Sequence, residues 1–359
     1  MFNNYKTWLE IDSTAIEKNI KSFRSILEKK TQLWAVVKSN AYGHGLNDFS
    51  ALAAKFGVDG FCVDSVPEAL ALRKDKHTQP ILVLGPTISD LFQEAEDNDV
   101  IITISSRDIL RQLIENKSKV AFHLKIDSGM HRQGFYPEDI EDVCQMIKDH
   151  QLNLQGAYTH YASFKKIDQQ LVEYEKALAV LEKNGFTNIV KHTAATAAAL
   201  ANSKTHFDMV RIGIGLYGLW PTTDLKNQHD LELRPVLSWH TIISEIKPVK
   251  EGAAIGYDGT EKMMKDGQLA ICPIGYWHGV DIGLSRQGEV LINGQRAKMM
   301  GRVSMDLTTI NVSDIDCQVG DRVTLIGDEL RVEEIAKKID TIHYEVLTRI
   351  NPLIQKNII

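Results

Sequence analysis

Lys38 is the residue of this chain whose setting most directly suggests chemistry. The five apolar residues 33–37 run directly into it, and the β-branched pair Val36-Val37 favours a strand. An unbroken apolar run of this length is typical of a strand buried on both faces of a parallel sheet, with ligands bound near its carboxyl end. An amine withdrawn from water there favours its neutral form, the nucleophile that a Schiff base requires. The competing interpretation is a strand-end lysine that extends into solvent.

Ionisable side chains also follow five other apolar runs. They are Asp64, Lys125 with Asp127, His160, His192 and Arg211. In an α/β barrel the carboxyl ends of all strands meet at one rim, where functional residues gather. The pattern therefore indicates a charged cluster around Lys38, although Lys125 and Asp127 alone are explained equally well as a strand-end ion pair.

The apolar runs that must position these residues alternate with helical stretches. Eight runs lie at 33–37, 60–63, 81–84, 100–104, 120–126, 154–158, 189–191 and 209–212, and helical patterns are clearest at 67–73, 138–148 and 169–184. Eight strands separated by helices, at roughly 25 residues per unit, predict an α/β fold with an N-terminal (β/α)8 TIM-like barrel.

A second, β-rich domain is predicted after Arg234-Pro235, because the residue before a proline is held extended. Asn293-Gly294 then marks a hairpin turn between two apolar runs. We expect a barrel domain over 12–235 and a C-terminal, mostly antiparallel β domain over 236–359. The strand at 7–11 is left over from the barrel and is free to join the β domain.

Composition excludes several classes of function. The 359 residues suggest two domains, and a net charge of −6 gives no support for nucleic-acid binding. No apolar run approaches the roughly 20 residues of a membrane span, and the start at 1–6 lacks the apolar core of a signal peptide. The 4 cysteines form no CxxC and indicate reduced thiols in a cytoplasmic protein, and the 12 histidines show no metal-ligand spacing.

The segment Ala35-Val-Val-Lys38-Ser-Asn-Ala-Tyr42-Gly-His-Gly45 resembles the pyridoxal-phosphate attachment site of the alanine racemase family, AVVKANAYGHG. Only Ser39 departs from that form, and further matches extend over nearly the whole chain. The resemblance implies that Lys38 carries pyridoxal 5′-phosphate as a Schiff base and that Tyr42 reaches the phosphate.

The segment 123–134 resembles the family's LKxDTGMGRxG, with His131 in place of a glycine. The resemblance implies that Arg132 lies near the cofactor's ring hydroxyl and the substrate carboxylate. It also implies that Lys125 is the lysine that is carbamylated in many members. A carbamate is anionic and would orient Arg132 through two hydrogen bonds.

Two further segments match motifs around the pyridine ring. Thr159-His160-Tyr-Ala resembles T-H-x-A, which implies that His160 packs against the ring and contacts Arg211. The segment 210–218 resembles V-R-x-G-I-x-x-Y-G, which puts Arg211 against the pyridine nitrogen. Because arginine keeps its proton, it cannot protonate the ring fully, which suits simple proton exchange and discourages transamination.

The phosphate site is implied by the same segment and by 192–196, which resembles H-x-x-N-S. Gly213 lets the backbone approach the phosphate, and Gly213 and Ile214 would offer backbone N–H groups. Thr196 stands where a serine would contact the phosphate, and its hydroxyl can do the same. Ala195 replaces the asparagine, so one polar contact is lost.

Two segments of the β domain also match. The segment 255–260 resembles V-G-Y-G-x-T, which implies that Tyr257 is the second catalytic base, although by itself it reads equally well as a turn tyrosine packed on glycines. A phenol needs cations nearby to release its proton at neutral pH, and Arg211 and His160 are the candidates. The segment 301–306 matches G-R-V-[CS]-M-D, which implies that the backbone N–H of Met305 meets the substrate carboxylate.

Two departures from the family bear on substrate and cofactor. Gly275-Tyr276-Trp277-His278-Gly279 stands where the family has G-Y-A-D-G, a segment that lines the substrate entry in relatives. Trp277 and His278 are larger and change the charge, which leaves substrate choice open. Ile358 occupies the position of a phosphate-binding tyrosine, so we expect weaker cofactor binding unless another group compensates.

The predicted function is that of a pyridoxal-phosphate-dependent isomerase that interconverts L- and D-alanine, supplying D-alanine for peptidoglycan precursors. Lys38 and Tyr257 would exchange the α-proton from opposite faces. The family also implies a homodimer with shared active sites, a small amino acid as substrate, and neither nucleic acid nor membrane as partner.

Three alternatives stay open. The first is the same chemistry on another small amino acid such as serine. The second is a non-catalytic pyridoxal-phosphate-binding protein of the same barrel lineage, which usually lacks the β domain with Tyr257 and Met305. The third is a decarboxylase of related fold, which would bring an acidic group, not Arg211, to the pyridine nitrogen.

Overall fold

The computed structural model describes residues 5–359, and it divides into two compact units. Residues 1–4 lie outside the described residues. They belong to the segment 1–6, which we expect not to be a signal peptide. The first unit comprises 15–41 and 46–234, and the second comprises the described residues 5–14, 42–45 and 235–359.

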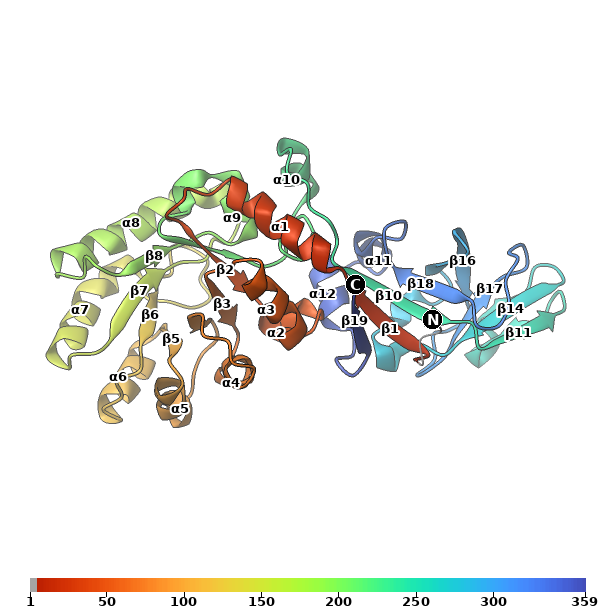
Figure 1. The fold of residues 1–359 in the computed structure, drawn as a ribbon, viewed down its shortest axis with the longest axis horizontal. Helices are drawn as coiled ribbons and strands as arrows, with labels where there is room; N and C mark the ends of the chain where they lie inside the picture. The colour runs from red at the N-terminus through yellow and green to blue at the C-terminus, as the bar shows by residue number, and fades with distance from the viewer. Residues whose placement is uncertain (1–4) are drawn as a thin grey trace. The chain divides into compact units, whose positions relative to one another are not determined.

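The first unit is built on an eight-stranded parallel sheet in the order β8-β7-β6-β5-β4-β3-β2-β9 (Figure 1). The strands are β2 (Gln32–Val36), β3 (Gly60–Val63), β4 (Ile81–Val83), β5 (Val100–Ile104), β6 (Phe122–Lys125), β7 (Leu154–Tyr158), β8 (Val190–His192) and β9 (Met209–Ile212). The backbone N–H of Arg211 on β9 donates to Ala194 O just past β8, at 2.9 Å, which closes the sheet. The eight parallel strands and this contact between the first and last of them confirm the predicted barrel.

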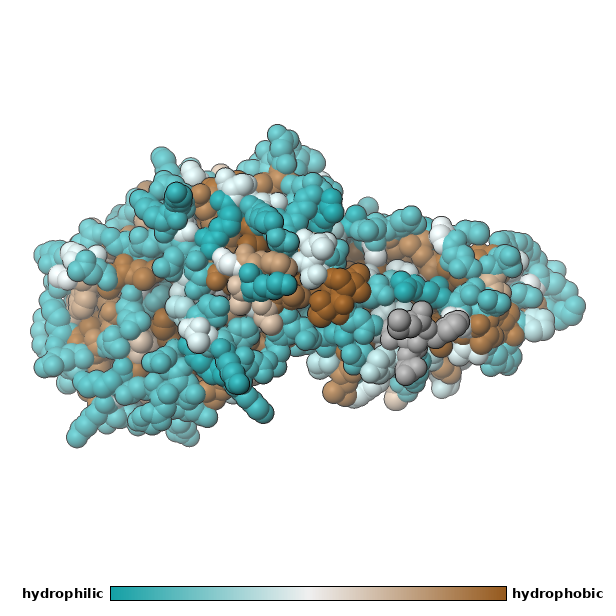
Figure 2. Space-filling view, in the orientation of Figure 1, coloured by the Kyte–Doolittle hydropathy of each residue, from teal (hydrophilic) through white to brown (hydrophobic). Residues whose placement is uncertain are grey.

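One helix precedes β2, and the other helices of this unit follow barrel strands in chain order. They are α1 (Ser13–Ser25), α3 (Leu46–Lys55), α4 (Val66–Lys74), α5 (Phe92–Asp97), α6 (Arg107–Glu115), α7 (Ile140–Asp149), α8 (Ile167–Lys183), α9 (Thr196–Ala201) and α10 (Thr223–Gln228). Gly185, with a φ of 92°, follows α8 at a position that favours glycine. On the face drawn in Figure 2, hydrophilic side chains cover most of these helices.

The second unit is a nine-stranded, mostly antiparallel sheet in the order β11-β14-β17-β16-β15-β18-β10-β1-β19. The strands are β1 (Thr7–Ile11), β10 (Leu237–Ile242), β11 (Glu245–Val249), β14 (Gly267–Cys272), β15 (Glu289–Ile292), β16 (Gln295–Met300), β17 (Thr308–Asn311), β18 (Arg322–Ile326) and β19 (Gln355–Ile358). The N-terminal strand β1 pairs antiparallel with β10 and parallel with β19. The C-terminal domain therefore has the predicted β architecture and takes in the leftover N-terminal strand.

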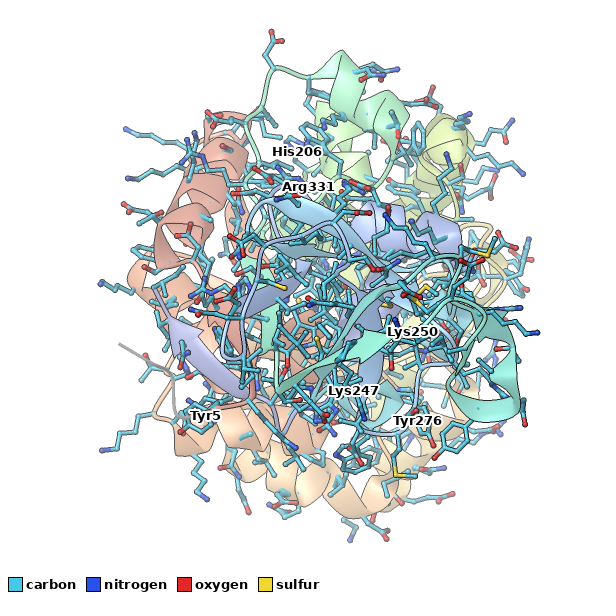
Figure 3. The ribbon with its side chains drawn as sticks, turned by 90° about the vertical axis from the view of Figure 1, so that its right-hand side faces the viewer. Tyr5, His206, Lys247, Lys250, Tyr276 and Arg331 are labelled. Atoms are coloured by element: carbon cyan, nitrogen blue, oxygen red, sulfur yellow. The ribbon has the colours of Figure 1, made fainter. Side chains whose placement is uncertain are left out.

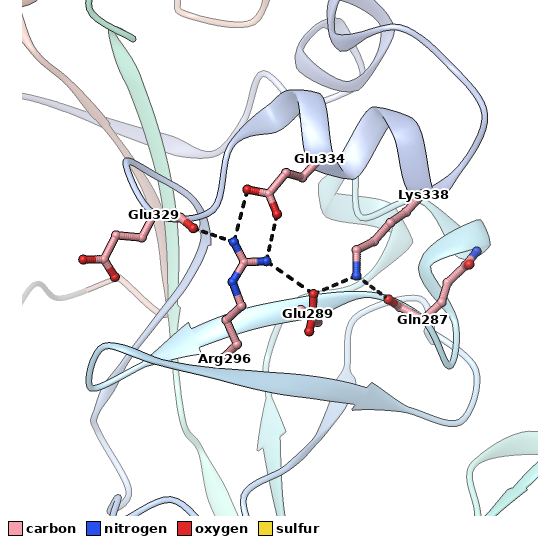
Figure 4. A network of polar contacts seen from close by, with 6 residues as sticks. All are labelled: Gln287, Glu289, Arg296, Glu329, Glu334 and Lys338. Carbon is pink, nitrogen blue, oxygen red and sulfur yellow. Dashed lines mark hydrogen bonds and ion pairs between the residues drawn. The ribbon is translucent and has the colours of Figure 1, made fainter.

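Two helices, α11 (Val332–Lys338) and α12 (His343–Thr348), complete this unit. Figure 4 shows how α11 is tied to the β15–β16 hairpin. Arg296 Nη1 lies 2.8 Å from Glu334 Oε2 and Nη2 lies 3.1 Å from Oε1, while Lys338 Nζ lies 2.7 Å from Glu289 Oε2. This bidentate contact and the adjacent ion pair fix the helix on the sheet.

Within residues 5–359, no helix is long and apolar enough to cross a membrane. The same part of the chain holds no group of three or more His, Cys, Asp or Glu side chains that could bind a metal ion. Its four cysteines are free thiols.

Candidate active site

Lys38 begins a short left-handed turn, α2 (Lys38–Tyr42), immediately after the barrel strand β2. Ser39, Asn40 and Ala41 have φ values of 55°, 56° and 50°, and Tyr42 has a φ of 52°. For residues with a Cβ this conformation costs roughly 1–2 kcal/mol each. Strain of this kind is typical of functional sites, and here it falls on the segment that carries the candidate Schiff-base lysine.

The Lys38 side chain is 36% exposed, so the sequence-based expectation of a desolvated amine is wrong for this structure. Its Nζ lies 3.2 Å from Oδ1 of Asp64, the residue that follows β3. The Lys38 side chain thus has a carboxylate partner at the rim.

Lys125, at the end of β6, is the buried lysine of the rim and is only 5% exposed. Its Nζ lies 4.6 Å from the centre of the Tyr158 ring. Burial, followed by the nearby Arg211 and Arg132 guanidinium groups, lowers the pKa of Lys125 to about 7, although Asp127 acts in the opposite direction. A substantial fraction of this amine is therefore neutral near pH 7.

Asp127 does not form the strand-end ion pair with Lys125 that was the alternative interpretation. Its Oδ1 accepts backbone N–H groups from Gly129, Met130 and His131 at 2.9, 2.9 and 3.0 Å. Burial disfavours the charged carboxylate, but these three donors outweigh it and lower the pKa of Asp127. Asp127 thus shapes the turn that leads to Arg132, which is exposed.

Arg211 is the fixed cation of the rim and is 2% exposed. Its Nη2 donates to the backbone carbonyls of Thr159 and Thr193, at 2.8 and 3.1 Å, and its Nη1 donates to Nδ1 of His192. Because a guanidinium only donates, we infer that His192 carries its proton on Nε2, which lies 2.8 Å from Nδ1 of His123. The arginine is therefore oriented by a directed chain of hydrogen bonds through two imidazoles.

Both imidazoles of this chain are neutral. Burial, followed by Arg211, lowers the pKa of His123 to about 3 and that of His192 well below its usual value. The His192 ring also stacks on Tyr158, with centroids 4.8 Å apart and an angle of 8°. These contacts fix the guanidinium without adding a second charge.

His160 follows β7 and is half-buried. Burial, and then Arg211, lowers its pKa to about 3, so its imidazole is neutral. Among residues 5–359, no hydrogen bond joins this imidazole to Arg211, which instead contacts the neighbouring carbonyl of Thr159. The expected side-chain contact is therefore replaced by a backbone contact one residue earlier.

Thr196 contacts the loop that follows β9. Thr196 Oγ1 accepts the backbone N–H groups of Gly213 and Gly215, at 3.2 and 3.4 Å. A Cβ at Gly215 would lie 2.4 Å from the Phe23 ring, so only glycine fits there. Tyr217 then donates to Val36 O at 2.8 Å, which ties this loop to the strand that leads to Lys38.

The β-domain candidates are positioned by two joined turns. Tyr257 is 69% exposed and follows Gly256, whose φ is 69°, and the adjacent Asp258 accepts from Arg302 Nη1 at 2.7 Å. The backbone N–H of Trp277 donates to Met305 O at 3.0 Å. The segments with Tyr257 and Met305 are therefore linked through 301–305.

The residues that depart from the family motifs differ in how buried they are. Tyr276, labelled in Figure 3, and Trp277 are exposed, whereas His278 is buried and its Nδ1 accepts the Gly275 N–H at 3.2 Å. His278 thus supports the turn rather than facing solvent. Ile358 on β19 is 46% exposed.

Sequence reasoning missed three residues of this site: Glu68, His123 and Tyr158. Tyr158 ends an apolar run and His123 begins one of the motifs. The sequence therefore suggests only that both side chains pack in the interior of the barrel. Glu68 lies at the third position of α4, where a glutamate usually caps its own helix. No sequence pattern at any of these three positions predicts the contacts that the residue makes at the rim.

The parallel barrel, its charged rim and the appended β sheet define an α/β-barrel enzyme with a second, β domain. Residues 11–221 match the family model for the alanine racemase N-terminal domain, and residues 236–358 match that for the C-terminal domain. The chain belongs to the alanine racemase family of isomerases.

Full-length relatives agree with this assignment. The chain is 33% identical over 378 residues to the alanine racemase of Leptospira interrogans, covering 100% of this chain and 97% of that protein. It is 37% identical over 367 residues to the alanine racemase of Listeria monocytogenes, covering 98% of each. The crystal structure of Bacillus anthracis alanine racemase with bound L-Ala-P superimposes with a TM-score of 0.94 at 33% identity, covering 99% of this chain and 96% of that one.

Proposed function

We propose that this protein is a pyridoxal-phosphate-dependent racemase that acts on alanine, with Lys38 as the attachment site. The observation that carries the proposal is the strained left-handed turn that starts at Lys38, at the rim of the barrel. The functional division follows the predicted boundaries, with a cofactor-binding barrel over 12–235 and a β domain over 236–359.

The residues present fit pyridoxal 5′-phosphate. The Gly213 and Gly215 N–H groups donate to the Thr196 oxygen, which leaves the Thr196 hydroxyl proton as a donor, and within residues 5–359 the neighbouring Ile214 N–H has no acceptor. Donors grouped in this way suit a phosphate. We assign this cluster to the phosphate together with Tyr42, and Arg211 and His160 to the ring.

The bound cofactor would withdraw electrons from the substrate and acidify its α-carbon. Lys38 Nζ then holds or releases the proton on one face, and the Tyr257 phenol does so on the other. The oriented Arg211 contributes a permanent positive charge, and Arg132 and the Met305 N–H bind the substrate carboxylate. Racemisation then moves two protons, because one of these groups takes the α-proton from its face while the other gives its own proton to the opposite face.

Each active site, in this proposal, takes Lys38 from one chain and Tyr257 from a second copy in a homodimer. A symmetric dimer of this kind provides two equivalent sites. The shared arrangement makes the exposed Tyr257 part of a working site once two chains associate.

A second candidate is the racemisation of another small amino acid, such as serine. The observation in its favour is Trp277, which is 58% exposed in the segment where relatives have a small residue. A bulkier indole changes the space and polarity offered to the substrate side chain, so alanine and serine must be compared directly.

Borohydride trapping tests the attachment site. Wild-type protein incubated with pyridoxal phosphate should show the visible absorbance of a lysine-bound cofactor, and reduction should label the peptide that contains Lys38. Lys38→Ala should show neither. A labelled peptide that contains a different lysine would refute the assignment.

A further inference from the structure

The carboxylate of Glu68 lies between two loops of the barrel rim and bonds to both. Its Oε1 accepts the backbone N–H of Ser39 at 2.7 Å and that of Asn40 at 3.4 Å. Its Oε2 accepts the backbone N–H of Asp64 at 2.8 Å. One side chain thus joins the turn that follows Lys38 to the residue that pairs with the Lys38 amine.

Glu68 does not serve as a helix cap. The spacing Ser65-x-x-Glu68 is that of a capping box, in which the glutamate would accept the N–H of Ser65. The Ser65 side chain forms no capping hydrogen bond, and the glutamate reaches past Ser65 to Asp64 and to the loop after β2. Its carboxylate therefore accepts hydrogen bonds from the loops of the rim rather than from the first turn of α4.

The left-handed turn needs this support because none of its first residues is glycine. Ala41 N–H donates to Val37 O at 2.8 Å, which is a backbone contact within the segment. Within residues 5–359, Glu68 is the acceptor for both of the preceding N–H groups, those of Ser39 and Asn40. A carboxylate that accepts from two N–H groups favours the conformation that presents both to it.

We propose that Glu68 is a positioning residue: it holds the left-handed turn and the Asp64 backbone together so that the Lys38 amine is directed to the cofactor. Glu68 acts through these backbone groups and touches neither cofactor nor substrate. The proposal rests on the proposed role of Lys38 as the attachment site.

The test uses Glu68→Gln, which keeps the shape of the side chain but replaces one acceptor oxygen with an amide group. We expect binding of pyridoxal phosphate, followed by its visible absorbance, to weaken roughly 10- to 100-fold, the effect of losing a charge-assisted hydrogen bond. The turnover number should also fall, with a smaller change in KM. Glu94→Gln is the matched control, because Glu94 lies in the first turn of α5 and is exposed.

A second substitution separates positioning from general stability. Glycine adopts positive φ without the penalty of a Cβ, and the exposed Ser39 forms no side-chain hydrogen bond among the described residues. Ser39→Gly should therefore restore part of the cofactor affinity in the Glu68→Gln protein. If Glu68→Gln does not fold, Glu68→Asp replaces it, since it keeps the charge but shortens the reach, and the same weakening and rescue are expected.

Cofactor affinity within twofold of wild type in folded Glu68→Gln protein would overturn the proposal, and so would a double variant as weak as Glu68→Gln alone. The Lys38→Ala variant distinguishes a wrong role for Glu68 from a wrong assignment of the cofactor attachment site. If Lys38→Ala still forms the lysine-bound absorbance band, the proposed function fails whatever Glu68 does. If that band is lost but Glu68→Gln binds normally, only the role of Glu68 is wrong.

Discussion

At the scale of single residues, the rim combines fixed charges with one amine of adjustable charge. Arg211 is oriented by two carbonyls and an imidazole, and its guanidinium stays protonated at neutral pH although burial lowers its pKa. Lys125 is different, because burial and two guanidinium groups lower its pKa to about 7. Its neutral form is a nucleophile that can react with carbon dioxide.

We therefore predict that Lys125 is carbamylated. The modification replaces a cation beside Arg132 with an anion, which removes a repulsion. As the pH falls below about 7, the amine becomes protonated and the carbamate should be lost. Carbon-13 NMR in labelled bicarbonate should show a carbamate signal at pH 8 that weakens toward pH 6, and that signal should be absent from Lys125→Arg. An unmodified Lys125 at pH 8 with bicarbonate present would contradict this prediction.

The second residue-scale prediction concerns Ile358. A tyrosine at this position would offer the phosphate a charge-assisted hydrogen bond, worth roughly 1.5–3 kcal/mol. Ile358→Tyr should therefore tighten pyridoxal-phosphate binding by roughly tenfold or more. Ile358→Phe is the control, because it adds the ring without the hydroxyl. Equal affinity in the two variants would show that no phenol reaches the phosphate.

At the scale of elements, two connections position the lysine. Glu68 supports the turn after β2 from one side, and Tyr217 bonds to the end of β2 from the loop after β9. Beyond the turn, a Cβ at Gly43 would lie 2.2 Å from Leu347 O on α12, so the chain requires a glycine at that position. The direction of Lys38 thus depends on neighbouring loops rather than on β2 alone.

Removing the Tyr217 hydroxyl should destabilise this arrangement. In Tyr217→Phe the buried carbonyl of Val36 loses a donor, so we expect the free energy of unfolding to fall by roughly 1–3 kcal/mol. Urea unfolding measures the change, and Tyr5→Phe, at an exposed position, serves as control. A loss no larger than that of the control would mean that the hydrogen bond contributes little.

The sequence predicts the strands of this fold better than it predicts the turns that carry the chemistry. Unbroken apolar runs identify the barrel strands because burial on both faces requires them. Positive φ at three successive residues could not be predicted, since Ser39 and Ala41 are of types that usually avoid it and the Glu68 carboxylate that bonds to Ser39 and Asn40 is distant in sequence. The role of Glu68 could not be predicted for a related reason: its spacing fits a local cap, whereas two of its partners, Ser39 and Asn40, lie 29 and 28 residues earlier in the chain.

At the scale of the whole molecule, the two catalytic candidates lie in different compact units. Lys38 belongs to the barrel unit and Tyr257 to the β unit. A two-base racemase needs a proton carrier on each face of the α-carbon, and we propose that Lys38 and Tyr257 supply them across a dimer.

Complementation tests the shared site. Lys38→Ala and Tyr257→Phe should each be nearly inactive. When the two are unfolded and refolded together, a mixed dimer has one intact and one doubly altered site, and about a quarter of wild-type activity should return. Mass spectrometry must first confirm that mixed dimers form. Activity that stays absent in their presence would contradict a shared site.

Exchange of the α-proton in deuterated water tests the central claim most directly. Protein loaded with pyridoxal phosphate should convert L-alanine into both enantiomers carrying deuterium at the α-carbon, faster than it does L-serine, and Lys38→Ala should abolish the exchange. Exchange on serine but not on alanine would contradict the substrate assignment. Loaded wild-type protein that exchanges the α-proton of no amino acid would contradict the proposed racemase.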